Sequence, residues 1–86
     1  MKIQKNVLTK QAYTQEGEKI ILSYLVFQTD GEYGIEVRLK RRLKTESALF
    51  RGVTRSEKQA FFLRDRLANG LVTPVCLREI LEDLLS

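Results

Sequence analysis

The stretch that decides the fold is residues 19–43, which read KIILSYLVFQTDGEYGIEVRLKRRL. Asp30-Gly31 separates two apolar runs, and this dipeptide favours a two-residue type I′ turn between antiparallel strands. The second run has a period of two, typical of a strand. One side carries Tyr33, Ile35, Val37, Leu39 and Leu43, and the other Glu36, Arg38, Lys40 and Arg42. We therefore predict a hairpin of two strands, at about 19–29 and 33–43.

Further strands are predicted on both sides of this hairpin. Residues 2–13 alternate loosely between apolar and polar side chains, and a turn at 14–18 containing Gly17 follows them. Lys44-Thr45-Glu46 is predicted to turn the chain into a short fourth strand at 47–53. The strand at 19–29 is apolar on both sides, so it is either central or covered on its second face. The first half of the chain thus predicts a four-stranded antiparallel meander.

The second half predicts two helices. Thr54 and Glu57 have the spacing of a capping box, which starts a helix over about 55–69 with Gly70 as its left-handed end. Thr73-Pro74 starts a second helix, 74–85, which has the strongest amphipathic pattern in the chain. The predicted buried residues are Ala60, Phe61, Leu67 and Ala68, with Leu63 at one edge, and then Leu77, Ile80, Leu81, Leu84 and Leu85. We predict one α+β domain over residues 1–86, with both helices packed on one face of the sheet.

Composition argues against an enzyme. The 86 residues include no His and one Cys, and no glycine-rich phosphate loop occurs. A structural zinc site needs about four Cys or His ligands, so we expect no metal and no cofactor. The candidate catalytic carboxylates fall in predicted turns or on an exposed helix face, where nothing would raise their pKa for acid–base catalysis. They are Glu16 with Glu18, Asp30 with Glu32, and Glu79 with Glu82 and Asp83. We expect no catalytic residues and predict no small-molecule ligand.

The same counts bear on location. A single cysteine, Cys76, cannot form an internal disulfide, and small secreted domains usually need several. No secretory signal follows Met1, and the longest mostly apolar stretch, residues 20–27, is far shorter than the roughly 20 residues of a membrane span. We expect a cytoplasmic protein without a membrane partner. Cys76 borders the apolar stripe of the last helix, so we expect a buried structural thiol there.

Positive charge is concentrated in one segment. Between Arg38 and Arg55 lie seven basic residues and one acidic residue, whereas the whole chain has a net charge of only +4. Arg38, Lys40, Arg42 and Arg51 are candidate contacts for nucleic acid or another anionic polymer. The alternative is a solvated strand whose charges keep a sheet edge unpaired. A helix-turn-helix interpretation is disfavoured, because the last helix would present Glu79, Glu82 and Asp83 to DNA.

Apolar residues are in surplus for a domain with one covered sheet face. Phe61 and Phe62 are adjacent on a helix, about 100° apart, so only one of them can face the core well. Phe62 is therefore a candidate protein-interface residue, as is the second apolar side of strand 19–29. The alternative is that strand twist and long Arg and Lys side chains cover this surface. The leading functional hypothesis is a non-catalytic protein-interaction module, with a homodimer as a candidate assembly, and the alternative is the binding of nucleic acid or another anionic polymer.

Several short motifs resemble those of a known family. They are Glu32–Val37, Leu67-Ala68, Val72-Thr73-Pro74-Val75 with Leu77, and Ile80–Asp83. Together they resemble a family of small uncharacterised proteins from clostridia and related Firmicutes, classed only as a domain of unknown function. In this family the position of Cys76 is often His, which disfavours a thiol role there. The resemblance implies a bacterial, cytoplasmic protein and brings no activity, cofactor or functional residue.

Overall fold

The structure, a computed structural model, describes the backbone of residues 3–86 and the side chains from Val7 onward. Four antiparallel strands form one sheet in the order β1-β2-β3-β4, and two helices follow. The predicted α+β fold is thereby confirmed, although the predicted first residue of the first strand lies outside the described residues. The elements are β1 (Ile3–Tyr13), β2 (Lys19–Thr29), β3 (Glu32–Arg41), β4 (Lys44–Thr54), α1 (Glu57–Asn69), a short 3-10 helix η1 (Pro74–Cys76) and α2 (Leu77–Leu85).

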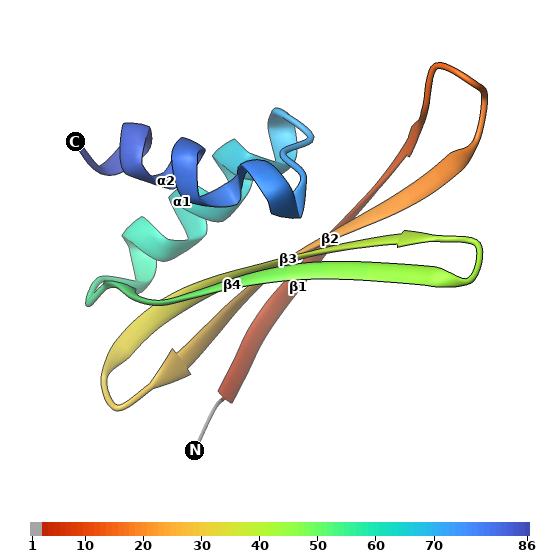
Figure 1. Ribbon diagram of the computed structural model, residues 1–86. Helices are drawn as coiled ribbons and strands as arrows, with labels where there is room; N and C mark the ends of the chain where they lie inside the picture. Colours follow the sequence, from red (N-terminus) through yellow and green to blue (C-terminus); the bar gives the residue numbers. More distant parts are fainter. Residues whose placement is uncertain (1–2) are drawn as a thin grey trace.

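The helices lie together on one side of the sheet (Figure 1). The β1–β2 and β3–β4 turns extend from one end of the sheet, beyond the helices. The strands are 10 or 11 residues long, longer than the usual five or six, and the molecule measures 41 Å along its longest axis. At this end of the sheet, the helices therefore cover neither face.

The turn between β2 and β3 forms as the sequence predicts. Thr29 pairs with Glu32, and the two residues between them have positive φ angles, 53° for Asp30 and 78° for Gly31. Positive φ at both central positions defines the type I′ turn, whose twist matches that of the flanking strands. This turn sets the register of the central pair, in which Tyr24 lies opposite Val37.

The turn between β3 and β4 is not where it was predicted. Arg41 pairs with Lys44, so the turn consists of Arg42 and Leu43 alone. Arg42 adopts a φ of 42°, a left-handed conformation that no local Gly or Asn signalled. β4 consequently begins at Lys44 rather than at 47, and Leu43 is fully exposed at the hairpin tip instead of facing the core. The predicted turn at Lys44–Glu46 was wrong.

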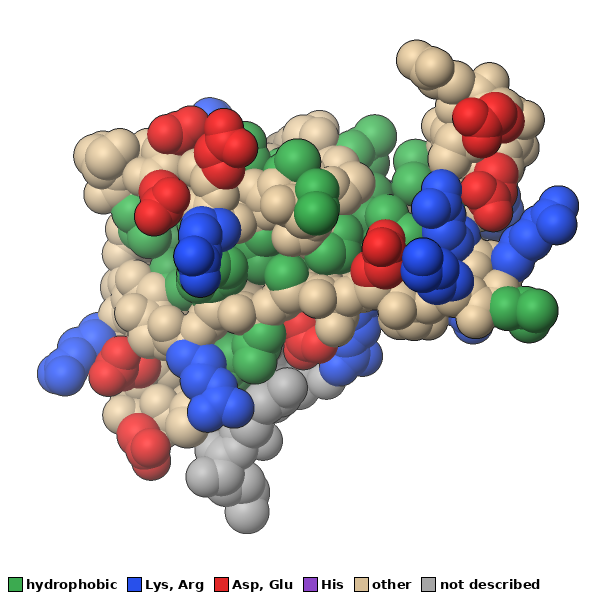
Figure 2. Space-filling model, in the orientation of Figure 1, with side chains coloured by type: hydrophobic (Ala, Val, Ile, Leu, Met, Phe, Trp, Pro, Cys, Tyr) green, Lys and Arg blue, Asp and Glu red, His purple; other side chains and the backbone are tan. Residues whose placement is uncertain are grey.

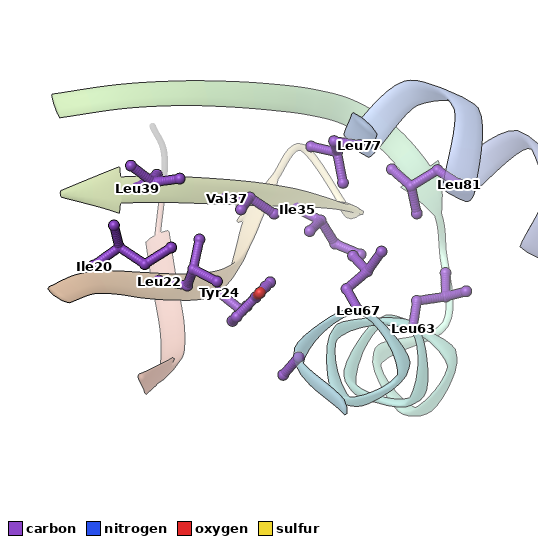
Figure 3. Close-up of a cluster of buried hydrophobic side chains, with 11 residues drawn as sticks. Ile20, Leu22, Tyr24, Ile35, Val37, Leu39, Leu63, Leu67, Leu77 and Leu81 are labelled. Carbon is purple, nitrogen blue, oxygen red and sulfur yellow. The ribbon is translucent and has the colours of Figure 1, made fainter. Parts of the chain in front are cut away.

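The core forms between the helices and one face of the sheet (Figure 3). Leu63 and Leu67 of α1 and Leu77 and Leu81 of the last helix point toward the central strands. A smaller cluster joins Val26, Tyr33 and Ala60 with the partly buried Phe61. The residues contributed by β2 and β3 to the main cluster are Ile20, Leu22, Tyr24, Ile35, Val37 and Leu39.

Tyr24 connects the sheet to the segment between the two helices. Its side chain is fully buried, and its hydroxyl donates a hydrogen bond of 2.9 Å to the Val72 carbonyl. Burial raises the pKa of Tyr24 to about 12, because the phenolate would lose its hydration. The neutral phenol thus satisfies a backbone carbonyl where the chain leaves α1.

The start of α1 differs from the predicted capping box. Ser56, not Thr54, is the N-cap, and its hydroxyl accepts a 3.1 Å hydrogen bond from the Gln59 amide. Thr54 is the last residue of β4, and its hydroxyl accepts from the Ser56 amide at 3.1 Å. The strand extends further than predicted, so the helix begins two residues later.

The end of α1 also differs from the prediction. Gly70 has an ordinary φ of −89°, and Leu71 carries the left-handed conformation with a φ of 51°. The Leu71 amide bonds to the Ala68 carbonyl and the Val72 amide to the Leu67 carbonyl, which is the Schellman pattern. Val72 also packs against the core beside its bonding partner, and this contact accompanies such helix ends. The pattern is satisfied one residue later than the glycine suggested.

The predicted second helix begins as a 3-10 turn at Pro74–Cys76 and becomes α-helical at Leu77. Thr73 makes no side-chain capping bond. Cys76 is exposed, contrary to the predicted buried thiol, because the 3-10 geometry changes the rotation of this turn relative to the α-helical stripe. No helix in the described part of the chain is long and apolar enough to cross a membrane.

The sheet face away from the helices buries two large side chains without helical cover. Leu25 and Phe27 are 2% and 1% exposed. The Phe27 ring lies over Gly34, where a Cβ atom would fall inside van der Waals contact with both this ring and the Phe50 carbonyl oxygen. The apolar surplus predicted for strand 19–29 is thus largely absorbed within the sheet itself.

Candidate functional site

Strand pairing defines three rows of side chains on the face opposite the helices. Successive side chains along a strand alternate between faces, and directly paired residues share one. The row nearest the β3–β4 turn is Gln11, Ile21, Lys40 and Thr45, the next is Thr9, Ser23, Arg38 and Ser47, and the third is Val7, Leu25, Glu36 and Leu49. Beyond the first row, Tyr13 pairs with Lys19 on the same face. We call this pair and the first two rows the basic face.

The basic face carries positive charge without a carboxylate of its own. Its charged side chains are Lys19, Arg38 and Lys40, and its other polar groups are hydroxyls and one amide. Among residues 7–86, no acidic side chain forms an ion pair with Lys19 or Lys40. Its side chains are exposed apart from the partly buried Ile21 and Ser23. The face therefore offers accessible cations to an anionic ligand.

Arg38 is held at the border of this face. Its Nε donates to a Glu36 carboxylate oxygen at 3.0 Å, and one terminal nitrogen donates to the other oxygen at 3.4 Å. The Glu36 side chain is 10% exposed, whereas that of Arg38 is 46% exposed. The ion pair orients the guanidinium and leaves part of it accessible, and the Glu36 carboxylate offsets part of its positive charge.

Two acidic residues near the same end, Glu18 and Glu46, lie on the helix side of the sheet, and Glu16 lies in the turn between β1 and β2. Glu46 pairs with the core residue Leu39. Glu18 forms a 3.3 Å ion pair with Arg41, which lies next to Lys44 across the hairpin. Figure 2 shows blue and red side chains interspersed at this end of the molecule. Near this end, the face opposite the helices therefore carries Lys19, Arg38 and Lys40, with Glu36 paired to Arg38 at its border, whereas the helix side carries both signs of charge.

The four sequence-predicted basic residues do not form one strip. Arg38 and Lys40 share the basic face, and Arg42 lies in the adjoining turn. Arg51 lies near the other end of the sheet, where it lines a shallow hollow with Asp30 and Glu32. At roughly 3.3 Å per residue, it is about 26 Å along the strands from Arg42. The predicted strip is therefore divided, and Arg51 belongs to a different surface.

Phe62, the predicted protein-interface residue, is 59% exposed on α1. Lys58 and Arg66 precede and follow it by one helical turn, so it is flanked by charge on its own helix. Its neighbour Phe61 is partly buried against the smaller core cluster and stacks beneath the Arg64 guanidinium at 4.8 Å. The structure brings Phe61 to the core and leaves Phe62 outside it.

Sequence reasoning missed Tyr13 and Lys19 as members of the site. Tyr13 is 67% exposed, whereas Tyr24 and Tyr33 are buried. The polar side of the strand predicted at 33–43 carries no aromatic residue. Tyr13 lies on the same face of the sheet only because β1 pairs with β2. The available signal was the turn at 14–18, because counting outward from it places Tyr13 opposite Lys19.

No cluster of three potential metal ligands is present in the part of the chain that the structure describes. Comparison with known proteins gave no match among curated proteins and none among solved structures. The family described as "Family of unknown function (DUF6514)" matches residues 3–86. Because the match covers the whole sheet and both helices, the chain belongs to this family of unknown function.

Proposed function

We propose that this protein is a non-catalytic module that binds an anionic polymer, nucleic acid being the ligand class, through its basic face. The observation that carries the proposal is the difference in charge between the two faces of the sheet at the end that holds the β1–β2 and β3–β4 turns. A phosphate backbone that approaches Lys19 and Lys40 meets no carboxylate among the described residues of that face. The single free thiol fits a cytoplasmic location for such a module.

The physical basis is phosphate neutralisation. Lys and Arg side chains that contact phosphates release condensed counterions, and this release dominates nonspecific affinity. Lys40 and Arg38 lie two residues apart on β3, about 7 Å along the strand, with Lys19 on the adjacent strand. An open sheet end beyond the helices leaves room for an extended chain to cross several strands (Figure 1). Both features suit a polymer better than a small anion.

The test is a binding titration with matched charge variants. Fluorescence anisotropy of a labelled oligothymidylate of about ten nucleotides, at about 20 mM salt, measures affinity where phosphate contacts are strongest. The triple variant Lys19→Gln, Arg38→Gln, Lys40→Gln removes the cations of the basic face. A control triple variant, Lys44→Gln, Arg55→Gln, Lys58→Gln, removes the same charge from exposed positions elsewhere. We expect the first variant to lose at least about tenfold in affinity and the control to lose much less.

Two outcomes would contradict the proposal. Absence of binding by the wild-type protein at low salt would exclude nucleic acid as the ligand. Equal losses in the two triple variants would show that overall charge, not the basic face, attracts the polymer. Circular dichroism on each variant confirms that the sheet and helices are intact before the affinities are compared.

A second candidate function is self-association through β4, which is an edge strand of 11 residues. Antiparallel pairing of two copies about Leu49 would place Leu49 opposite Leu49 and Ala48 opposite Phe50. This register keeps side chains of the same face together, as a continuous sheet requires. Leu49 is 38% exposed, so its burial would contribute to such a dimer. The observation that favours this candidate is the exposed Leu49 on a strand at the edge of the sheet.

Light scattering coupled to size exclusion tests this candidate at micromolar protein. We expect a dimer mass that Leu49→Lys converts to a monomer, because two lysines would then face each other across the pairing. Phe62→Ser is the matched test of the exposed helix residue and should leave the dimer intact. A monomer mass for the wild-type protein at all concentrations would exclude the candidate.

A further inference from the structure

The basic face contains one feature that a purely electrostatic surface does not need, the exposed aromatic ring of Tyr13. Tyr13 ends β1, and its neighbour Ala12 packs against the core, so the alternation of the strand places the tyrosine on the opposite face. Tyr13 is 67% exposed. Its partner across the strands is Lys19. A stacking surface and a cation are therefore adjacent at the open end of the sheet.

The surroundings of this ring are suited to bases rather than to phosphates alone. Gln11, two residues earlier on β1, offers an amide that both donates and accepts hydrogen bonds. Next to it, Ile21 gives a partly buried apolar floor between Gln11 and Lys40. The adjoining hydroxyls, from Thr9, Ser23, Thr45 and Ser47, add further donors and acceptors. Apolar, amide and hydroxyl groups of this kind contact base faces and base edges.

A duplex cannot use this combination, because its bases are stacked internally and present only edges in the grooves. An unpaired strand can place a base on an aromatic ring while neighbouring cations contact its phosphates. Stacking is also tolerant of sequence, since every base has a π-face. A surface that combines Tyr13 with Lys19 and Lys40 is therefore better suited to a single strand than to a duplex.

We infer that the basic face binds single-stranded nucleic acid, with Tyr13 stacking on a base and Lys19, Lys40 and Arg38 contacting the phosphates. The inference rests on the proposed polyanion-binding function and adds to it the strandedness of the ligand and a specific base contact. The chemistry is shared by single-stranded DNA and RNA, so the experiment includes both.

The protein provides its own probe for this contact. It contains no Trp and three Tyr residues, of which Tyr24 and Tyr33 are buried. Stacking of a base on Tyr13 should therefore quench tyrosine emission through this one accessible ring. The titrants are oligothymidylate and oligouridylate of about ten nucleotides and a DNA duplex of the same length. A labelled copy of each, followed by anisotropy, reports affinity independently of the quenching.

The deciding variants are Tyr13→Leu and Tyr13→Phe. Leu keeps apolar bulk without a π-face, and we expect it to weaken single-strand binding by about 5- to 150-fold, the range for loss of one stacked base. Phe keeps the ring, so single-strand affinity should be retained. Duplex affinity, which should be at least about tenfold weaker in the wild-type protein, should not change in either variant. The wild-type emission should fall on saturation with either single strand.

The failures of the two proposals are distinguishable. If duplex and single strands bind equally and Tyr13→Leu changes neither affinity, the single-strand inference is overturned while polyanion binding stands. If none of the three ligands binds at about 20 mM salt, both proposals fail. If Tyr13→Leu and Tyr13→Phe weaken single-strand binding equally, the contact is not stacking and the inference is overturned.

Discussion

At the end of α1, Leu71 adopts a left-handed backbone conformation that glycine would adopt more easily. The adjacent Gly70 has a backbone conformation that any residue can adopt. The φ angles are 51° at Leu71 and −89° at Gly70. A left-handed conformation costs an L-residue roughly 1 kcal/mol, and glycine avoids this cost. We expect Leu71→Gly to be more stable than Leu71→Ala by about 1 kcal/mol, measured by urea unfolding. Both variants remove the half-exposed side chain, so their difference isolates the backbone.

Gly70→Ala is the companion test. A Cβ at Gly70 would meet its neighbours at 3.6 Å or more, an ordinary van der Waals distance. Alanine also reduces the entropy of the unfolded chain, so the substitution should be neutral or stabilising by up to about 1 kcal/mol. If Gly70 were the left-handed residue, as the sequence pattern predicts, the same substitution would be destabilising. A clear loss of stability in Gly70→Ala would therefore contradict the assignment of the helix end.

The buried hydroxyl of Tyr24 gives a second test at the scale of one residue. Tyr24→Phe leaves the Val72 carbonyl without its 2.9 Å partner, and we expect a loss of about 1–2 kcal/mol at neutral pH. The pKa of about 12 in the folded protein exceeds the usual value of 10.0. The contribution of Tyr24 is therefore complete below pH 10 and declines by up to about 1.4 kcal/mol per pH unit between pH 10 and 12.

Urea unfolding of wild type and Tyr24→Phe at pH 7 and at several pH values above 10 measures this decline. The stability advantage of the wild type should shrink over this window, because the unfolded state releases the phenolic proton first. Tyr13→Phe serves as the control for removal of a tyrosine hydroxyl at an exposed position. A constant difference between wild type and Tyr24→Phe from pH 7 to 12 would contradict a raised pKa for Tyr24.

At the scale of elements, the sheet depends on a close fit between β2, β3 and β4 at Gly34. The Phe27 ring and the Phe50 carbonyl oxygen occupy the space into which a Cβ would project. Gly34→Ala should therefore cost about 1–3 kcal/mol or more through overpacking. Phe27→Leu in the same chain should recover part of this loss, because the obstructing ring is removed. Additive losses in the double variant, measured by urea unfolding, would show that the two residues do not compete for this space.

Elements were predicted correctly where neighbouring residues in the sequence determine them, and not where pairing between distant residues does. Alternation along residues 33–41 and the Asp30-Gly31 pair are local signals, and the strands and turn they predict are present. The turn at Arg42-Leu43 has no such signal, because its register is set by the continuous pairing of residues 35–41 of β3 with residues 44–50 of β4. The same holds for the basic face. Lys40 and Arg38 were identified from one strand, whereas Tyr13 and Lys19 join them through pairing across separate strands.

At the scale of the whole molecule, a net charge of +4 conceals an asymmetric surface. The last helix carries Glu79, Glu82 and Asp83, and the helix side of the hairpin end mixes Glu18 and Glu46 with its cations. The opposite face near that end concentrates Lys19, Arg38 and Lys40. If the positive charge acted uniformly, neutralising any one exposed cation would weaken binding equally. If the asymmetry matters, only cations on the basic face should affect binding, and two lysines on one hairpin are enough to distinguish these cases.

Lys40 and Lys44 are that pair, because both are exposed and lie near the same turn but project from opposite faces. For single strands, the logarithm of affinity falls with the logarithm of salt concentration with a slope of about −0.7 per phosphate contact. Three contacts predict a slope of about −2 for the wild-type protein. Lys40→Gln should reduce the magnitude of this slope by about 0.7, whereas Lys44→Gln should leave it unchanged. Equal changes in both slopes would mean that the ligand responds to net charge, and the charge separation between the faces would then have no part in binding.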